Sequence, residues 1–163
     1  MQVKKMSEYD GKVNEKVVQW VTFCLGDETY GIMVMQVQEV LRIPDIAPVP
    51  GSASYVVGII NLRGNVVTVV DTRHRFGLPP KELDDASRIV VIEVGNQIIG
   101  ILVDSVAEVV ELKSSDIESA PNVGNDESSK FIMGVSSQDG KLLILVDLEK
   151  FLDIEELAEL DCL

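Results

Sequence analysis

The sequence predicts an all-β protein made of two small five-stranded β-barrels that are related by an internal duplication. Each half of the chain contains about five short segments rich in Val, Ile and Leu, separated by turn residues roughly every 8 to 12 positions. Long helical patterns are missing before the C-terminal segment, and the second half repeats the first. Barrels are favoured because closure hides strand edges that would otherwise recruit other chains.

The duplication is visible as two constant offsets. Residues 21–34 align without a gap on residues 90–103, and the same offset of 69 relates Glu39 to Glu108. Further along, an offset of 76 relates Gly58, Gly64 and Asp71 to Gly134, Gly140 and Asp147. We expect the extra seven residues (76 − 69 = 7) in a loop over residues 113–130, because Ser, Gly, Asn and Asp there predict a mobile segment.

The elements of each half follow from local patterns. The first half is expected to contain a flexible lead, a hairpin, a helical turn running into a strand, a proline-rich loop, a second hairpin and one helical turn, at residues 1–14, 17–33, 34–41, 44–52, 56–71 and 72–76. The two subdomains are then residues 15–80 and 81–163, and the second includes a C-terminal helix over residues 147–160. We expect Asp71 and Asp147 to cap the helical turns that follow them.

Composition excludes several classes of partner and function. Lys and Arg number 14 against 27 acidic residues, for a net charge of −13, which argues against binding to nucleic acid or an anionic membrane. Apolar runs fall far short of the roughly 20 residues that a membrane helix requires, so no membrane insertion and a cytoplasmic location are expected. Cys24 and Cys162 are too few for a disulfide framework, and His74 is the only histidine. We therefore expect no catalytic residue, no cofactor and no bound metal.

The two halves of the repeat differ in the residues of one equivalent turn. The tetrapeptide at residues 61–64, Asn-Leu-Arg-Gly, becomes Ser-Gln-Asp-Gly at residues 137–140. Asp139 before glycine is a common hairpin solution, whereas Arg63 presents a planar fork of donors that suits carboxylates and carbonyls. Arg63 is therefore either a partner-binding residue or a surface arginine tied down within its own loop.

Several motifs together resemble the CheW-type chemotaxis coupling proteins. They lie at residues 25–32, 37–40, 58–64, 69–71, 98–104 and 142–151, and the similarity spans residues 17–160. The resemblance implies two intertwined SH3-like β-barrels that form one CheW-like domain. It also implies a non-enzymatic adaptor that links the cytoplasmic tips of methyl-accepting chemotaxis receptors to the regulatory domain of a CheA-type histidine kinase.

The resemblance also assigns partner-binding positions. They are Val37, Glu39, Gly58, Asn61, Leu62, Arg63, Ile89 and Val109. It does not divide them between receptor and kinase. Two alternatives within the family are a CheW-like regulatory module of another chemosensory-type pathway and a kinase-derived regulatory domain of the same fold. The start methionine and helical tail favour the free-standing adaptor over the kinase-derived domain. A third alternative, a small-molecule enzyme using the groove between the barrels, has no candidate acid or base in the sequence.

From the sequence we expect that Arg63→Ala and Gly58→Asp weaken binding to receptor or kinase and leave thermal unfolding nearly unchanged. Calorimetric titration of each variant against both partners measures the first effect. Binding equal to that of the parent protein would contradict the assignment.

Overall fold

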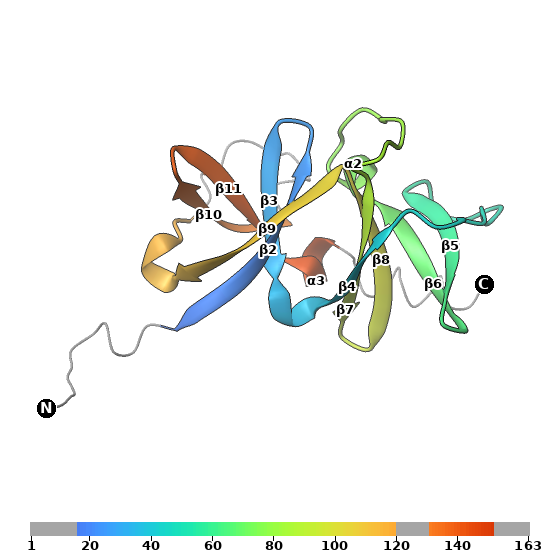
Figure 1. Ribbon diagram of the computed structural model, residues 1–163, viewed down its shortest axis with the longest axis horizontal. Helices are drawn as coiled ribbons and strands as arrows, with labels where there is room; N and C mark the ends of the chain where they lie inside the picture. The colour runs from blue at the N-terminus through green and yellow to red at the C-terminus, as the bar shows by residue number, and fades with distance from the viewer. Residues whose placement is uncertain (1–15, 120–130, 152–163) are drawn as a thin grey trace, which may run out of the picture.

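The structure is a computed structural model that describes residues 16–119 and 131–151, and these form two five-stranded sheets (Figure 1). The strands are β2 (Val17–Leu25), β3 (Glu28–Met33), β4 (Val37–Arg42), β5 (Val56–Leu62), β6 (Asn65–Asp71), β7 (Arg88–Val94), β8 (Gln97–Val103), β9 (Ser105–Lys113), β10 (Ile132–Gln138) and β11 (Lys141–Val146). Among the described residues, three short helical segments lie between strands, η2 (Val34–Gln36), α2 (Thr72–Arg75) and η3 (Ser114–Asp116), and α3 (Leu148–Phe151) follows the last strand. The predicted all-β fold class with two related units is confirmed.

Each sheet takes strands from both halves of the chain. The first sheet has the order β10-β11-β3-β2-β9, and the second has the order β4-β7-β8-β6-β5. The hairpin β2–β3 therefore completes the sheet of the second repeat, and its counterpart β7–β8 completes the sheet of the first. Each exchanged hairpin joins the other repeat through a parallel strand pair, β3 with β11 in the first sheet and β8 with β6 in the second. Figure 1 shows the first sheet on the left and the second on the right.

Both sheets curl until their end strands are linked. In the second sheet the segment after β4 forms an isolated bridge to β5, in which Ala47 and Ile59 exchange hydrogen bonds of 2.9 and 2.8 Å. In the first sheet Glu118, which follows β9, exchanges two bonds of 2.8 Å with Val135 of β10. The same closure at both ends of the duplication gives each sheet a barrel-like shape.

Most predicted elements lie where the sequence places them. The hairpins, the helical turn before β4 and the turn after β6 are confirmed. The predicted caps are confirmed as well, since a carboxylate oxygen of Asp71 accepts from His74 N at 3.3 Å and one of Asp147 accepts from Glu149 N at 3.1 Å.

Three predicted segments lie wholly or partly outside the described residues. The lead at residues 1–14 lies entirely outside them, as do residues 152–160 of the predicted C-terminal helix. The predicted start of the loop at residue 113 is wrong, because residues 113–118 complete β9, form η3 and make the Glu118 bridge. Residues 120–130 also lie outside the described residues.

The two sheets share one apolar core and each has a smaller one of its own. The shared cluster joins Phe23 of β2 to Val90 of β7 and Ile101 of β8, all essentially inaccessible to solvent. A second cluster around Ile89 lies inside the second sheet, and a third around Trp20 lies inside the first. Neither half of the chain supplies all the strands of a sheet, and burial of the shared cluster holds the two repeats together.

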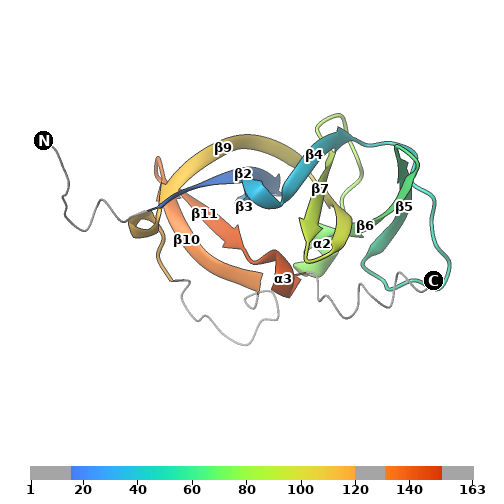
Figure 2. The same cartoon turned by 90° about the horizontal axis from the view of Figure 1, so that it is seen from below.

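Helices α2 and α3 close this shared core, and Figure 2 shows them beside each other between the sheets. The ring of Phe76, just after α2, lies 4.9 Å from the Tyr30 ring and 5.3 Å from the Phe151 ring, measured between centroids. Arg75 Nε donates to the Phe151 carbonyl oxygen at 3.0 Å, and its guanidinium lies 5.1 Å from the centroid of the Phe131 ring. The ends of the two repeats are thus fastened to each other.

The buried hydroxyl of Thr22 supplies hydrogen bonds at a register shift between β2 and β9. The register shifts between Val21 and Phe23, and Thr22 Oγ1 there donates to Glu108 O at 2.8 Å and accepts from Glu108 N at 2.9 Å. Thr22 is buried, so its hydroxyl replaces the ladder bonds that the bulge removes.

We expect Thr22→Val to destabilise the protein by about 1–3 kcal/mol, because it leaves both backbone groups of Glu108 without a partner. Urea unfolding followed by the fluorescence of Trp20, the single tryptophan, measures the loss. Thr68→Val on β6 is the matched control, since its half-buried side chain makes no hydrogen bond among the described residues, and it should be nearly neutral. Equal stability of the Thr22 variant and the parent would contradict this role.

Candidate partner-binding surface

Seven of the eight positions assigned by the resemblance lie on the second sheet. Those on β4 are Val37 and Glu39, those on β5 and its turn are Gly58, Asn61, Leu62 and Arg63, and Ile89 is on β7. Val109 lies on β9 of the first sheet. The structure therefore brings the β4 and β5 positions together and leaves Val109 on a different face.

The turn between β5 and β6 holds Arg63 in a left-handed conformation. Arg63 and Gly64 have φ of 51° and 87°, and their counterparts Asp139 and Gly140 have 52° and 80°. Both hairpins thus use two-residue turns with two positive φ values, and the Asn61 side chain supports the first by accepting from Gly64 N at 2.9 Å. Because Arg63 takes the same backbone form as Asp139, the exchange of side chain changes the surface and not the turn.

Arg63 pairs with Glu39, and this contact joins the two end strands of the curled sheet. Arg63 Nη1 donates to Glu39 Oε1 at 3.3 Å, and Nη2 donates to Oε2. The turn belongs to the end strand β5 and Glu39 belongs to the other end strand, β4, so the arginine is tied to a distant strand and not within its own loop. The two side chains are 70% and 25% exposed, respectively. The hydrogen bond from Arg63 lowers the pKa of Glu39, and the same bond raises the pKa of Arg63.

Exposed and half-buried apolar side chains occur on the elements that carry or adjoin this ion pair. Met35, Val40 and Val66 are large and exposed. Val37 and Leu62 are half-buried and pack on the cores. Protein interfaces combine apolar area, which supplies affinity, with polar and charged groups, which fix register, and these elements carry residues of both kinds.

Two of the assigned positions are parts of the interior. Gly58 is buried beneath the bridging segment, and a Cβ added there would lie 2.8 Å from Ile46 Cγ2 and closer still to the Ala47 carbonyl oxygen. Ile89 is 0% exposed and packs in the cluster inside the second sheet. Neither Gly58 nor Ile89 therefore offers a side chain to a partner directly. The expectation that Gly58→Asp leaves unfolding unchanged is therefore wrong, because the added side chain would displace the strand bridge.

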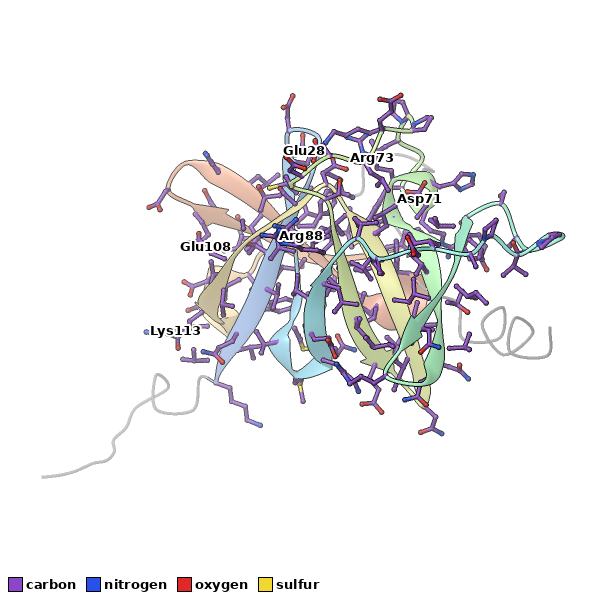
Figure 3. The ribbon with its side chains drawn as sticks, turned by 45° about the vertical axis from the view of Figure 1, so that its right-hand side comes forward. Glu28, Asp71, Arg73, Arg88, Glu108 and Lys113 are labelled. Atoms are coloured by element: carbon purple, nitrogen blue, oxygen red, sulfur yellow. The ribbon has the colours of Figure 1, made fainter. Side chains whose placement is uncertain are left out.

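Val109 is the one assigned position on the first sheet, and its side chain is 54% exposed. It pairs with Val21 beside the bulge that Thr22 fills. Figure 3 shows Glu108 and Lys113 on the same strand. This apolar side chain on a charged strand marks a second exposed surface, which differs from the one around Arg63.

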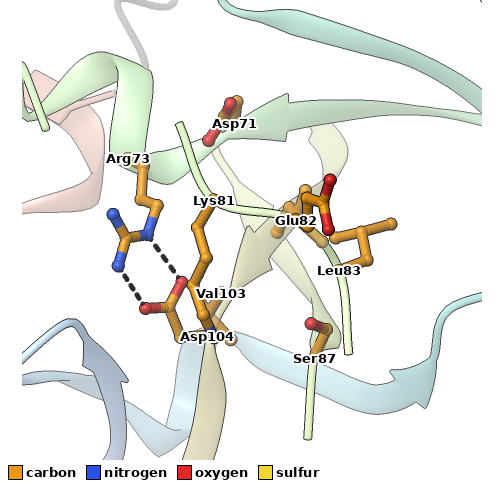
Figure 4. Close-up of a pocket in the computed structure, with 9 residues that line it drawn as sticks. Asp71, Arg73, Lys81, Glu82, Leu83, Ser87, Val103 and Asp104 are labelled. Carbon is orange, nitrogen blue, oxygen red and sulfur yellow. Dashed lines mark hydrogen bonds and ion pairs between the residues drawn. The ribbon is translucent and has the colours of Figure 1, made fainter. Parts of the chain in front are cut away.

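An ion pair that was not predicted from the sequence joins three segments. Asp104 accepts from Arg73 Nε at 2.8 Å and from Arg73 Nη2 at 2.6 Å (Figure 4). It also accepts from Gly26 N at 2.7 Å. Arg73 Nη1 also donates to Pro79 O at 2.8 Å. The bond from Arg73 lowers the pKa of Asp104. The repeat contains a signal for this residue. Asp104 stands at the position equivalent to Met35 (104 − 69 = 35), so a carboxylate in the second half replaces an apolar side chain in the first.

The hollow beside this ion pair has a volume of about 30 Å³, room for roughly one water molecule. Arg73, Asp104 and Lys81 of its lining are already held in ion pairs, and its small volume makes it a structural joint and not a substrate pocket. Within residues 16–119 and 131–151 no group of three or more His, Cys, Asp or Glu is placed to hold a metal ion. The same residues contain no helix long and apolar enough to cross a membrane.

Comparison with known proteins identifies the family of this chain. The model of the CheW-like domain matches residues 19–156. The chain belongs to the CheW-like family. The chemotaxis protein CheW of Treponema pallidum (strain Nichols) is 34% identical over 152 residues, which cover 91% of this chain and 89% of that protein. The chemotaxis protein CheW of Bacillus subtilis (strain 168) is 34% identical over 144 residues, covering 88% and 90%.

A solved CheW structure has the same fold. The crystal structure of the scaffolding protein TtCheW from Thermoanaerobacter tengcongensis superposes with a TM-score of 0.79 at 31% identity, covering 86% of this chain and 96% of that chain. The predicted resemblance is confirmed. The stretch that matches the CheW-like model, residues 19–156, contains strands of both exchanged sheets.

We expect Gly58→Asp to lower the free energy of unfolding by about 2–4 kcal/mol, because a buried charge without a partner is added to a steric clash. Asn61→Asp on the same strand is the matched control. It adds the same charge at an exposed position and keeps an oxygen to accept from Gly64 N, so it should change stability little. Thermal unfolding of both variants checks this, and equal midpoints would contradict the packing of Gly58.

The ion pair also predicts a titration. Arg63→Ala should raise the pKa of Glu39 toward its ordinary value, because the group that favours the carboxylate is removed. A depressed pKa means that any stability from the pair is present above the ordinary pKa and is lost as the pH falls through the lowered value. NMR titration of the Glu39 side-chain carboxyl carbon measures the shift. Asp139→Ala leaves Arg63 in place and should leave the titration unchanged. An unmoved Glu39 pKa in Arg63→Ala would contradict the pairing.

Proposed function

We propose that this protein is a non-enzymatic chemotaxis adaptor that couples the cytoplasmic tips of methyl-accepting receptors to the regulatory domain of a CheA-type histidine kinase. The observation that carries the proposal is membership of the CheW-like family over residues 19–156. Its relatives are named as chemotaxis proteins and, in one case, as a scaffolding protein. Scaffolding by a small rigid body agrees with a structure whose two sheets share a core.

The proposal assigns direct contacts to the exposed and half-buried positions. These are Val37, Glu39, Asn61, Leu62, Arg63 and Val109. Gly58 and Ile89 shape the same surface from beneath, by close backbone approach and by core packing. Since Val109 lies on the first sheet and the others lie on the second, two partners have separate surfaces available on one body.

Coupling follows from the rigidity of that body. An adaptor transmits a signal when a receptor in two conformations binds it with different free energies, because the difference then biases the partner that is bound elsewhere. The strand exchange and the buried shared core keep the two surfaces in a fixed relation. The protein itself has no chemical step to perform, and its affinities for the two partners set the size of the effect.

Co-sedimentation tests the function in one tube. The purified protein is mixed with receptor signalling fragments and the cognate kinase, pelleted, and assayed for kinase autophosphorylation. We expect the kinase to enter the pellet and its activity to become receptor-dependent only when the protein is present. Receptor control of the kinase that is the same without the protein would contradict the proposal.

Arg63→Ala should weaken binding to at least one partner by about three- to tenfold, the range for loss of a charged contact at an interface rim. Asp139→Ala is a matched control, because it places alanine at the same φ in the equivalent turn of the other sheet. Arg63→Asn removes the guanidinium while keeping a residue that tolerates this conformation. Calorimetric titration measures all three. Equal loss in the Arg63→Ala and Asp139→Ala variants would assign the effect to the turn and not to the arginine.

A further inference from the structure

Two arginines stand opposite each other at the end of the β4–β7 pair. Arg42, the last residue of β4, is the cross-strand partner of Arg88, the first residue of β7. Directly opposed residues point to the same face of a sheet, and like charges in that position repel. Acidic residues outnumber Lys and Arg by 27 to 14 in this chain, so a repulsive pair is not a consequence of composition.

The guanidinium of Arg88 is held in place on one side only. Its Nη1 donates to Asp85 O and to Ser87 O, both at 2.8 Å. Those bonds leave Nε and Nη2 without a hydrogen-bond partner among the described residues. Figure 3 shows Arg88 at the start of its strand. The backbone of residues 85–87 thus orients a charged fork and leaves part of it unused.

Arg42 is exposed and has no ion-pair partner among the described residues. Both arginines line a surface hollow of about 480 Å³ together with Ile43, Asp84, Asp85 and Ser87. The hollow lies at the end of β4, the strand that carries Glu39. Side chains alternate along a strand, so Arg42, three residues after Glu39, lies on the opposite face of β4, and the hollow is a separate surface from the one around Arg63.

The charges around the hollow leave an excess of one positive unit. Asp84 is neutralised by Lys81, whose Nζ lies 3.0 Å from Asp84 Oδ2. The remaining charges are +2 from Arg42 and Arg88 and −1 from Asp85, which sum to +1. A monoanion matches this excess, whereas a phosphate dianion would exceed it and would be repelled by the aspartate.

We propose that Arg42 and Arg88 form a binding site for a single carboxylate side chain of a partner protein. The carboxylate accepts from the free edge of the Arg88 fork and from Arg42, and it relieves the repulsion between them. The site stands on the geometry of this chain alone, whereas the identity of the partner as receptor or kinase rests on the function proposed above.

The first test uses a small-molecule probe and needs no partner. Sodium acetate is titrated against the protein while the Nε–Hε signals of its arginines are followed by NMR, with sodium chloride at equal ionic strength and inorganic phosphate as comparisons. We expect the Arg88 and Arg42 signals to move saturably with acetate and not with chloride. Arg63 and Arg73 already have carboxylate partners, so their signals should stay. Equal responses to acetate and chloride would overturn the site, and a stronger response to phosphate would overturn its assignment to a carboxylate.

The second test uses the proposed partners. Arg42→Gln should weaken binding to one of them by about three- to tenfold, with a smaller salt dependence than the parent, and Arg42→Glu should weaken it further. Lys141→Gln on β11 removes an equal charge from the first sheet and should change nothing. Trp20 fluorescence confirms that each variant folds.

The two tests separate failure of the site from failure of the proposed function. If acetate binds as expected and the parent binds neither partner, the adaptor function fails and the site stands. If the parent binds and Arg42→Gln binds equally well to both partners, the assignment of the site to them is overturned.

Discussion

The exchange of hairpins between the two repeats is the constraint on which the rest of the structure depends. Parallel pairing of β3 with β11 and of β6 with β8 inserts each hairpin into the sheet of the other repeat. Neither repeat can then close its sheet or bury its share of the common core alone. The chain behaves as one folding unit as a result, and surfaces on different sheets keep a fixed relation, which a scaffold needs.

Within this shared frame the two repeats have diverged at positions that the backbone leaves free. The turns around Arg63 and Asp139 have nearly the same φ values, so their side chains can differ without a change of fold. Thr22 fills a bulge in the first sheet, whereas Val91 occupies the equivalent position, at the offset of 69, in the second. Asp104 with Arg73 forms an ion pair across three segments. These differences give two related sheets different surfaces.

Elements governed by local chemistry were predictable from the sequence. Glycine turns, alternating strands and aspartate caps depend on neighbours in the chain, and the repeat supplied a second example of each. Burial at Gly58 and Ile89 was not predictable, because it depends on the segment carrying Ala47 and on a strand, β7, that is covered on both faces. The early part of the expected loop forms η3 and a bridge for the same reason, since Glu118 finds its partner on a strand that follows later.

The pairing of Arg63 with Glu39 belongs to this second, non-local class. It arises because the sheet curls until β4 and β5, its end strands, approach each other. Folding does not explain the arginine, since a left-handed turn position favours Asn, Asp or Gly and an exposed ion pair contributes little stability. The equivalent hairpin reaches the same conformation with Asp139 and Gly140 alone. What Arg63 adds is an oriented, exposed guanidinium beside Glu39, and the lack of a folding reason for it is the ground on which we propose it as a partner contact.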